Sequence, residues 1–193
     1  MIPDVAFLWV AAGIYAIAAL TLFIDIRKKK VNLYSLVMYF VAIALFLTFA
    51  QYELIASVIL SLAAVSIIHL PIRLEWPRAE KVIFLLLSIL MPALIIASFL
   101  YNANHLFVAH ALAFLSALVT SLYMMASTAK SPVQVKKTAL KIAGLILMTA
   151  IFAHITYLIP SLNLGIANLR PLVVALGAPF SLILSLYVGK NLR

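Results

Sequence analysis

Histidines carry most of the chemistry that this sequence offers. No Asp, Glu, Lys or Arg lies in the middle of its long apolar stretches, whereas His110 and His154 lie inside two of them. Those stretches cover 105–128 and 138–160. At about 1.5 Å per helical residue, His110 lies roughly 7 Å from the start of the first stretch and His154 roughly 9 Å from the end of the second. These two ends lie on the same side if the helices are antiparallel. Tyr157 follows His154 within one helical turn. Because an ionisable group inside an apolar segment is costly, we expect these three side chains to form a site.

Two imidazoles at matching depth allow several kinds of chemistry. They could ligate one haem iron axially, which would make haem b the cofactor. They could also hold a soft metal, with His105 or Glu53 as a further ligand. Alternatively, each histidine hydrogen-bonds a neighbouring hydroxyl or carbonyl and needs neither group. Our main prediction is a ligand-binding site without metal or cofactor, completed by Gln51 and Asn104 at the same side of the segments.

Motifs of the common enzyme classes are absent from the sequence. There is no Gly-rich phosphate loop, no Gly-x-Ser-x-Gly elbow and no His-Glu-x-x-His helix. The chain also has no cysteine, which removes disulfides, thiol chemistry and iron–sulfur ligation. We therefore predict that the protein is not an enzyme.

Seven apolar segments must position these side chains. Hydrophobic residues make up 67% of the chain and charged residues 10%, a composition that excludes a soluble globular domain. The expected spans are 4–25, 32–50, 54–72, 82–101, 105–128, 138–160 and 171–189. About 20 apolar residues cross a bilayer, and a crossing chain must satisfy its own backbone hydrogen bonds. The sequence thus predicts an all-α bundle of seven transmembrane helices in one domain, residues 1–193.

The positive charges predict how this bundle is oriented. If the segments alternate in direction, thirteen of the fourteen Lys and Arg residues fall on one side, and Arg170 falls on the other. The thirteen are Arg27, Lys28, Lys29, Lys30, Arg73, Arg78, Lys81, Lys130, Lys136, Lys137, Lys141, Lys190 and Arg193. Because short loops keep Lys and Arg in the cytoplasm, we expect a multi-pass protein of the cell membrane, N-terminus out and C-terminus in. The net charge of +9 then faces anionic lipid, not nucleic acid.

The last segment carries a helix-packing pattern. Small residues recur there every four positions, at Gly177, Ser181, Ser185 and Gly189. Such a ridge lets two helices approach closely in lipid. We expect the ridge to pack inside the bundle, with a homo-oligomer interface as the alternative.

Three features resemble the seven-helix sensory region of prokaryotic histidine kinases and related archaeal receptors. The first segment ends in Arg27-Lys28-Lys29-Lys30, the second closes at Gln51-Tyr52-Glu53, and the fourth contains Pro92 and leads to Asn102-Ala103-Asn104-His105-Leu106. Since no output domain follows by Arg193, the resemblance implies either a stand-alone sensor that signals through a partner protein in the membrane or the cytoplasm, or a shortened piece of a longer protein.

Three functions remain open from the sequence. The leading one is a receptor-like sensor that binds a small or lipidic ligand in an outward-facing pocket at His110, His154 and Tyr157. The first alternative is a membrane subunit that passes electrons to a quinone through one b-type haem. The second is a small-solute transporter or an accessory subunit of a membrane complex.

Overall fold

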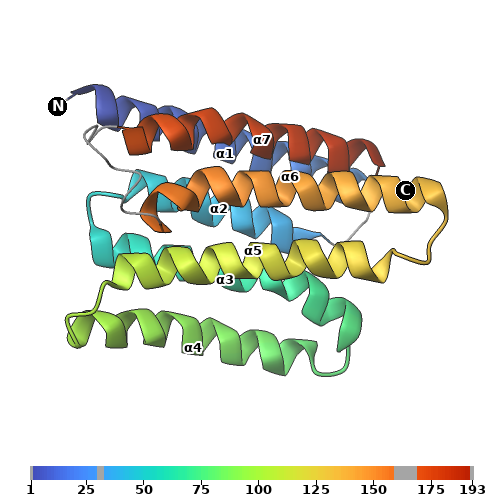
Figure 1. The fold of residues 1–193 in the computed structure, drawn as a ribbon, viewed down its shortest axis with the longest axis horizontal. Coiled ribbons are helices and arrows are strands. Elements are labelled where there is room, and N and C mark those ends of the chain that lie inside the picture. Colours follow the sequence, from blue (N-terminus) through green and yellow to red (C-terminus); the bar gives the residue numbers. More distant parts are fainter. Residues whose placement is uncertain (1, 30–32, 159–168, 192–193) are drawn as a thin grey trace.

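The computed structural model describes residues 2–29, 33–158 and 169–191, and all of its regular structure is α-helical (Figure 1). Seven helices follow one another along the chain. They are α1 (Ile2–Lys29), α2 (Tyr34–Thr48), α3 (Glu53–Glu75), α4 (Glu80–Leu100), α5 (His105–Ser127), α6 (Val133–Leu158) and α7 (Leu169–Asn191). The all-α class predicted from the sequence is confirmed.

Six of these helices are long and apolar enough to cross a membrane. The exception is α2, which has 15 residues where the sequence suggested a span over 32–50. At 1.5 Å per residue it is about 22 Å long, less than the roughly 30 Å of hydrocarbon in a typical bilayer. The chain is therefore a multi-pass membrane protein, and α2 by itself is shorter than the hydrocarbon layer.

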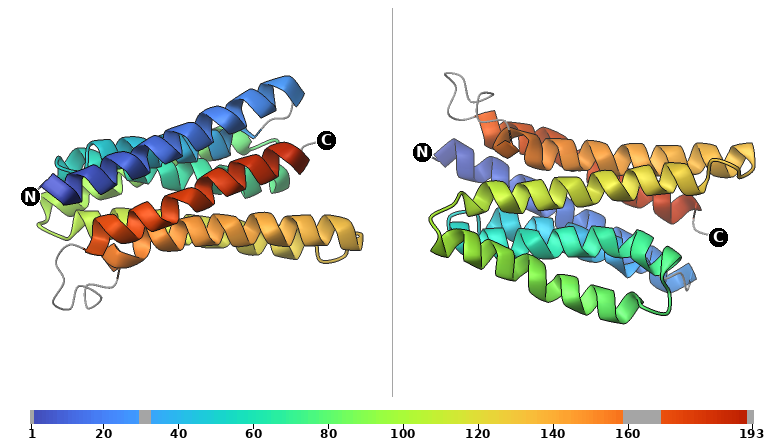
Figure 2. Two further views of the ribbon diagram at one scale, coloured as in Figure 1. Left: turned by 90° about the horizontal axis from the view of Figure 1, so that it is seen from above. Right: turned by 60° about the horizontal axis from the view of Figure 1, so that its bottom comes forward.

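Six helices form a closed ring and the seventh lies outside it. Around the ring, each helix packs on the next in the order α1, α2, α3, α5, α6, α7 and back to α1 (Figure 2). The odd-numbered helices run in one direction, so α1 and α7 are parallel neighbours, as are α3 and α5. Helix α4 packs mainly on α3 and more lightly on α5, and Ile95 is the one buried residue along its length.

The two ends of the bundle differ in charge. Helices α1, α3, α5 and α7 end together, and we call this the basic end because Arg27, Lys28, Lys29, Arg73 and Lys190 lie in their last turns. Helices α2, α4 and α6 begin there. The opposite end, where α1 begins, we call the N-terminal end.

Small residues on α7 allow close contacts with two neighbours. A Cβ added to Gly177 would overlap Phe152 of α6, and one added to Gly189 would overlap Asp25 of α1. Ser181 and Ser185 between them are fully buried. All four residues of the predicted ridge therefore lie inside this bundle, where larger side chains would push α7 off its neighbours.

A proline in α3 is compensated by a hydroxyl from α5. Pro71 has no N–H, so the carbonyl of Ile67 loses its usual helical donor. The Thr120 hydroxyl donates to that carbonyl at 3.0 Å, and Thr120 is fully buried. The helix consequently continues through Pro71 to Glu75, beyond residue 72 where the sequence pattern ended the span.

This compensation can be tested by a double-mutant cycle. We expect Thr120→Val to lower the free energy of unfolding by about 1–2 kcal/mol, because it leaves the Ile67 carbonyl buried without a donor. The cost should fall in a Pro71→Ala background, which restores a backbone N–H. Thr149→Val is the control, since the Thr149 hydroxyl bonds Leu145 of its own helix. Unfolding in detergent measures all variants, and an equal cost in both backgrounds would contradict the compensation.

Candidate functional site

The histidines predicted to meet do lie in contact. His110 from α5 and His154 from α6 face each other, with their Nδ1 atoms 2.9 Å apart and their ring centroids 5.2 Å apart. One Nδ1 must carry the proton and donate it while the other accepts, because two N–H groups would repel. The pair is thus a single hydrogen bond that joins α5 to α6 near the N-terminal end.

Aromatic rings surround this pair. Tyr157, the third predicted member, stacks on the His110 ring with centroids 3.9 Å apart and planes inclined by 9°. Phe46 of α2 meets the His110 ring edge-on at 5.1 Å. Three helices therefore contribute to the cluster, which we call the histidine cluster: Phe46, His110, His154 and Tyr157.

Burial decides how a ligand could reach the histidine cluster. Both histidines are fully buried, with no surface exposed to solvent. The Nε2 atom of His154 has no hydrogen-bond partner among the described residues. An unsatisfied buried nitrogen is costly, and in native proteins such groups often mark a functional position. A ligand that reached this nitrogen would have to part the helices around it.

The haem alternative does not fit this geometry. An iron between two axial imidazoles needs a nitrogen on each side, with the porphyrin plane between the rings. Here the Nδ1 atoms are in direct hydrogen-bond contact, which leaves no room for a metal or a macrocycle between them. Within the residues that the structure describes, no three His, Asp or Glu side chains gather into a metal site either.

The other two predicted ligand-binding residues lie on the surface. Asn104 is exposed and caps α5, since its side chain accepts a hydrogen bond from the backbone N–H of Phe107 at 2.9 Å. Gln51 is exposed in the turn between α2 and α3. From the sequence alone, an asparagine that caps a helix looks the same as an asparagine that binds a ligand.

A second polar cluster lies at the basic end, and the sequence reasoning did not assign it. The Oγ atom of Ser35, on α2, lies 2.6 Å from the Nδ1 atom of His69, on α3. The Nε2 atom of His69 lies 2.9 Å from Oε1 of Glu80, the first residue of α4. Arg73, one turn after His69 on α3, lies 3.9 Å from the same carboxylate oxygen. We call these four residues the serine cluster.

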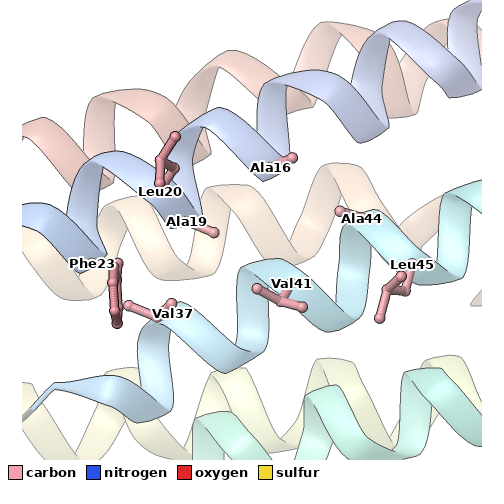
Figure 3. Close-up of a pocket in the computed structure, with 8 residues that line it drawn as sticks. All are labelled: Ala16, Ala19, Leu20, Phe23, Val37, Val41, Ala44 and Leu45. Carbon is pink, nitrogen blue, oxygen red and sulfur yellow. The ribbon is translucent and has the colours of Figure 1, made fainter.

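Neighbouring helices also leave an apolar groove on the outside of the ring. It lies between α1 and α2, has a volume of about 410 Å³, and presents only hydrocarbon side chains (Figure 3). Its lining residues are Ala16, Ala19, Leu20, Phe23, Val37, Val41, Ala44 and Leu45. Such a wall offers no hydrogen bonds and suits the acyl chain of a membrane lipid.

Comparison with protein-family models, with curated proteins and with solved structures finds no match to this chain. The fold defines a class of protein, a helical, multi-pass membrane protein, and this chain has a buried histidine cluster at one end and a half-buried serine cluster at the other.

Proposed function

We propose that the protein is a seven-span membrane sensor with its N-terminus outside the cell and its basic end in the cytoplasm. One observation, combined with a general rule of membrane topology, supports this orientation. Arg27, Lys28, Lys29, Arg73 and Lys190 lie in the last turns of α1, α3 and α7, at one end of the bundle, and cytoplasmic loops retain such residues. The histidine cluster then lies toward the outside, where a signal molecule arrives.

The hydrogen bond between His110 and His154 is the observation that carries the proposal. A buried polar link between two helices is a two-state element, because it is either made or broken. Whichever histidine donates, the Nε2 atom of His154 is left for another partner. A ligand with a single hydroxyl or carbonyl and an apolar body matches this requirement, since it can bond the Nε2 of His154 and pack on Phe46.

A change at the histidine cluster can reach the cytoplasmic end through the same two helices. The Ser121 hydroxyl of α5 donates to the Ala143 carbonyl of α6 at 3.1 Å, closer to the basic end. Helices α5 and α6 are therefore linked at two levels, one at the histidine cluster and one nearer the basic end, and a change in helix separation at one link strains the other. The turn between them, at residues 128–132, is the part of the pair that a cytoplasmic partner would contact.

A thermal-shift panel tests the ligand site. Purified protein in detergent is heated with a long-chain fatty acid, an isoprenoid alcohol or a quinone. A compound at one hundred times its dissociation constant should stabilise the fold by about 2.7 kcal/mol. We expect that shift to disappear in His110→Ala and in His154→Ala.

The control is His105→Ala, which removes a histidine from the same end of α5, where its ring meets Phe99 and not His110 or His154. This variant should keep the ligand shift. A shift that survives in both His110→Ala and His154→Ala would remove the proposed site.

A further inference from the structure

The serine cluster has the connectivity of a nucleophile, a base and an acid. Ser35, His69 and Glu80 come from α2, α3 and α4, and hydrogen bonds of 2.6 and 2.9 Å join them in that order. The four-residue turn after α3, at 76–79, folds α4 back so that its first residue reaches His69. Three helices thus converge on one imidazole.

The carboxylate fixes the direction of these hydrogen bonds. An ionised Glu80 can only accept, so Nε2 of His69 must carry the proton that it donates. In the neutral imidazole the other nitrogen, Nδ1, is then an acceptor. The Ser35 hydroxyl therefore donates to Nδ1, which is the arrangement that lets a histidine remove the proton of an attacking serine.

The surroundings of Ser35 suit an ester from the lipid phase. The serine lines a pocket of about 200 Å³, smaller than the pockets that enclose drug-sized ligands. Met38 and Phe84 line the same pocket and are exposed on the outer surface of the bundle, which faces hydrocarbon. Arg73 also lines it, and its positive charge offsets the Glu80 carboxylate 3.9 Å away, so the pocket does not repel an anionic headgroup. The pocket therefore holds an ester group while the acyl chain remains in the bilayer.

We propose that Ser35, His69 and Glu80 form a hydrolytic site for carboxylic esters of anionic membrane lipids. This activity goes beyond the proposed sensor function and lies at the other end of the bundle from the histidine cluster. Ser35 is the nucleophile, His69 is the general base and acid, and Glu80 is a positioning residue that holds the His69 tautomer.

The chemistry needs water and no other reactant. The Ser35 Oγ atom attacks the ester carbonyl while its proton moves to Nδ1 of His69, and the same proton then passes to the departing alcohol oxygen. A water molecule next attacks the acyl-serine and gives its proton to Nδ1, and that proton returns to Ser35 as the carboxylic acid leaves. One C–O bond of the substrate is broken in total, one water is consumed, and nothing is oxidised or reduced.

Backbone N–H groups can stabilise the negative charge on the carbonyl oxygen. Ser35 is the second residue of α2, and the first N–H groups of a helix have no acceptor within that helix. The N–H of Leu36 already donates to the Leu33 carbonyl at 3.1 Å, so the candidates for this role are the N–H groups of Tyr34 and Ser35, at the positive end of the helix dipole.

A serine-directed fluorophosphonate tests the proposal on the full-length protein in phosphatidylglycerol vesicles. We expect the wild type to be labelled covalently and Ser35→Ala to lose the label. Ser66→Ala is the matched control, because Ser66 lines the same pocket but its hydroxyl bonds the Leu62 carbonyl of its own helix. That control should be labelled at the wild-type rate. Absence of label on the wild type, or label retained on Ser35→Ala, would overturn the proposal.

A second variant separates activation of the oxygen from a purely structural hydrogen bond. The chain has no cysteine, so Ser35→Cys contains a single thiol. We expect iodoacetamide to alkylate this thiol at least tenfold faster than it does after His69→Ala is added, because His69 draws off the thiol proton. An alkylation rate that is independent of His69 would show that the histidine does not activate position 35 and would overturn the proposal.

Discussion

Glu80→Gln should slow hydrolysis of a lipid ester at Ser35 by about 10²- to 10⁴-fold, the range that a general base contributes. Two physical reasons lead to this expectation. The amide can donate to Nε2 of His69, which moves the imidazole proton to Nδ1 and removes the acceptor for the Ser35 hydroxyl. The amide also carries no charge to stabilise the imidazolium that forms during attack. Fatty acid released from phosphatidylglycerol vesicles measures the rate.

The kinetic constants distinguish positioning from loss of structure. We expect kcat to fall while KM changes little, because Glu80 acts through His69 and not on the substrate. Glu80→Asp keeps the charge and should recover part of the rate. Glu53→Gln, a neutralised carboxylate at the opposite end of the bundle, is the control and should leave the rate unchanged. Equal rates for wild type and Glu80→Gln would show that the carboxylate does not tune His69.

Cysteines introduced one at a time at the two ends of α2 should lie on opposite sides of the membrane. The same should hold for cysteines at the two ends of α5. In intact cells, a membrane-impermeant maleimide should label Gln51→Cys and Tyr101→Cys but not Lys28→Cys or Lys130→Cys. All four positions are exposed at the ends of helices, and the protein has no cysteine of its own. The expected difference is all-or-none, because an intact bilayer separates the two sides.

Permeabilised cells provide the control, in which all four variants should be labelled. Label on Lys28→Cys together with Gln51→Cys in intact cells would show that α2 does not cross, leaving six spans. The reverse pattern, with Lys28→Cys and Lys130→Cys labelled, would place the basic end outside.

Hydrophobic length predicted the helices well because it is a local property. The expected segment at 105–128 became α5 at His105–Ser127, and the segment at 82–101 became α4 at Glu80–Leu100. Length alone did not give the end of α3, since the expected segment stops at residue 72 and the helix runs to Glu75. The helix continued because a threonine on another helix supplied the missing donor, and no local pattern contains that contact.

The two polar clusters also differ in how far the sequence could predict them. His110 and His154 could be paired from the sequence because they lie at equal depth on helices that follow each other. His69 could not be paired in this way, because Ser35 is 34 positions away and Glu80 begins another helix. Only the fold of α4 back onto α3 brings the three together. The spacing of His69 and Arg73, one turn apart on one helix face, was the signal that the sequence did contain.

Helix α4 belongs to the serine cluster but not to the ring. It packs chiefly on α3 and only lightly on α5, and most of its surface is exposed, so it can tilt without opening the contacts among the other six helices. Bilayer thickness and lateral pressure act most directly on a helix of this kind. A thinner or thicker membrane would therefore alter the separation of Glu80 from His69 before it disturbed the rest of the protein, which makes the carboxylate the member of the cluster most sensitive to membrane composition.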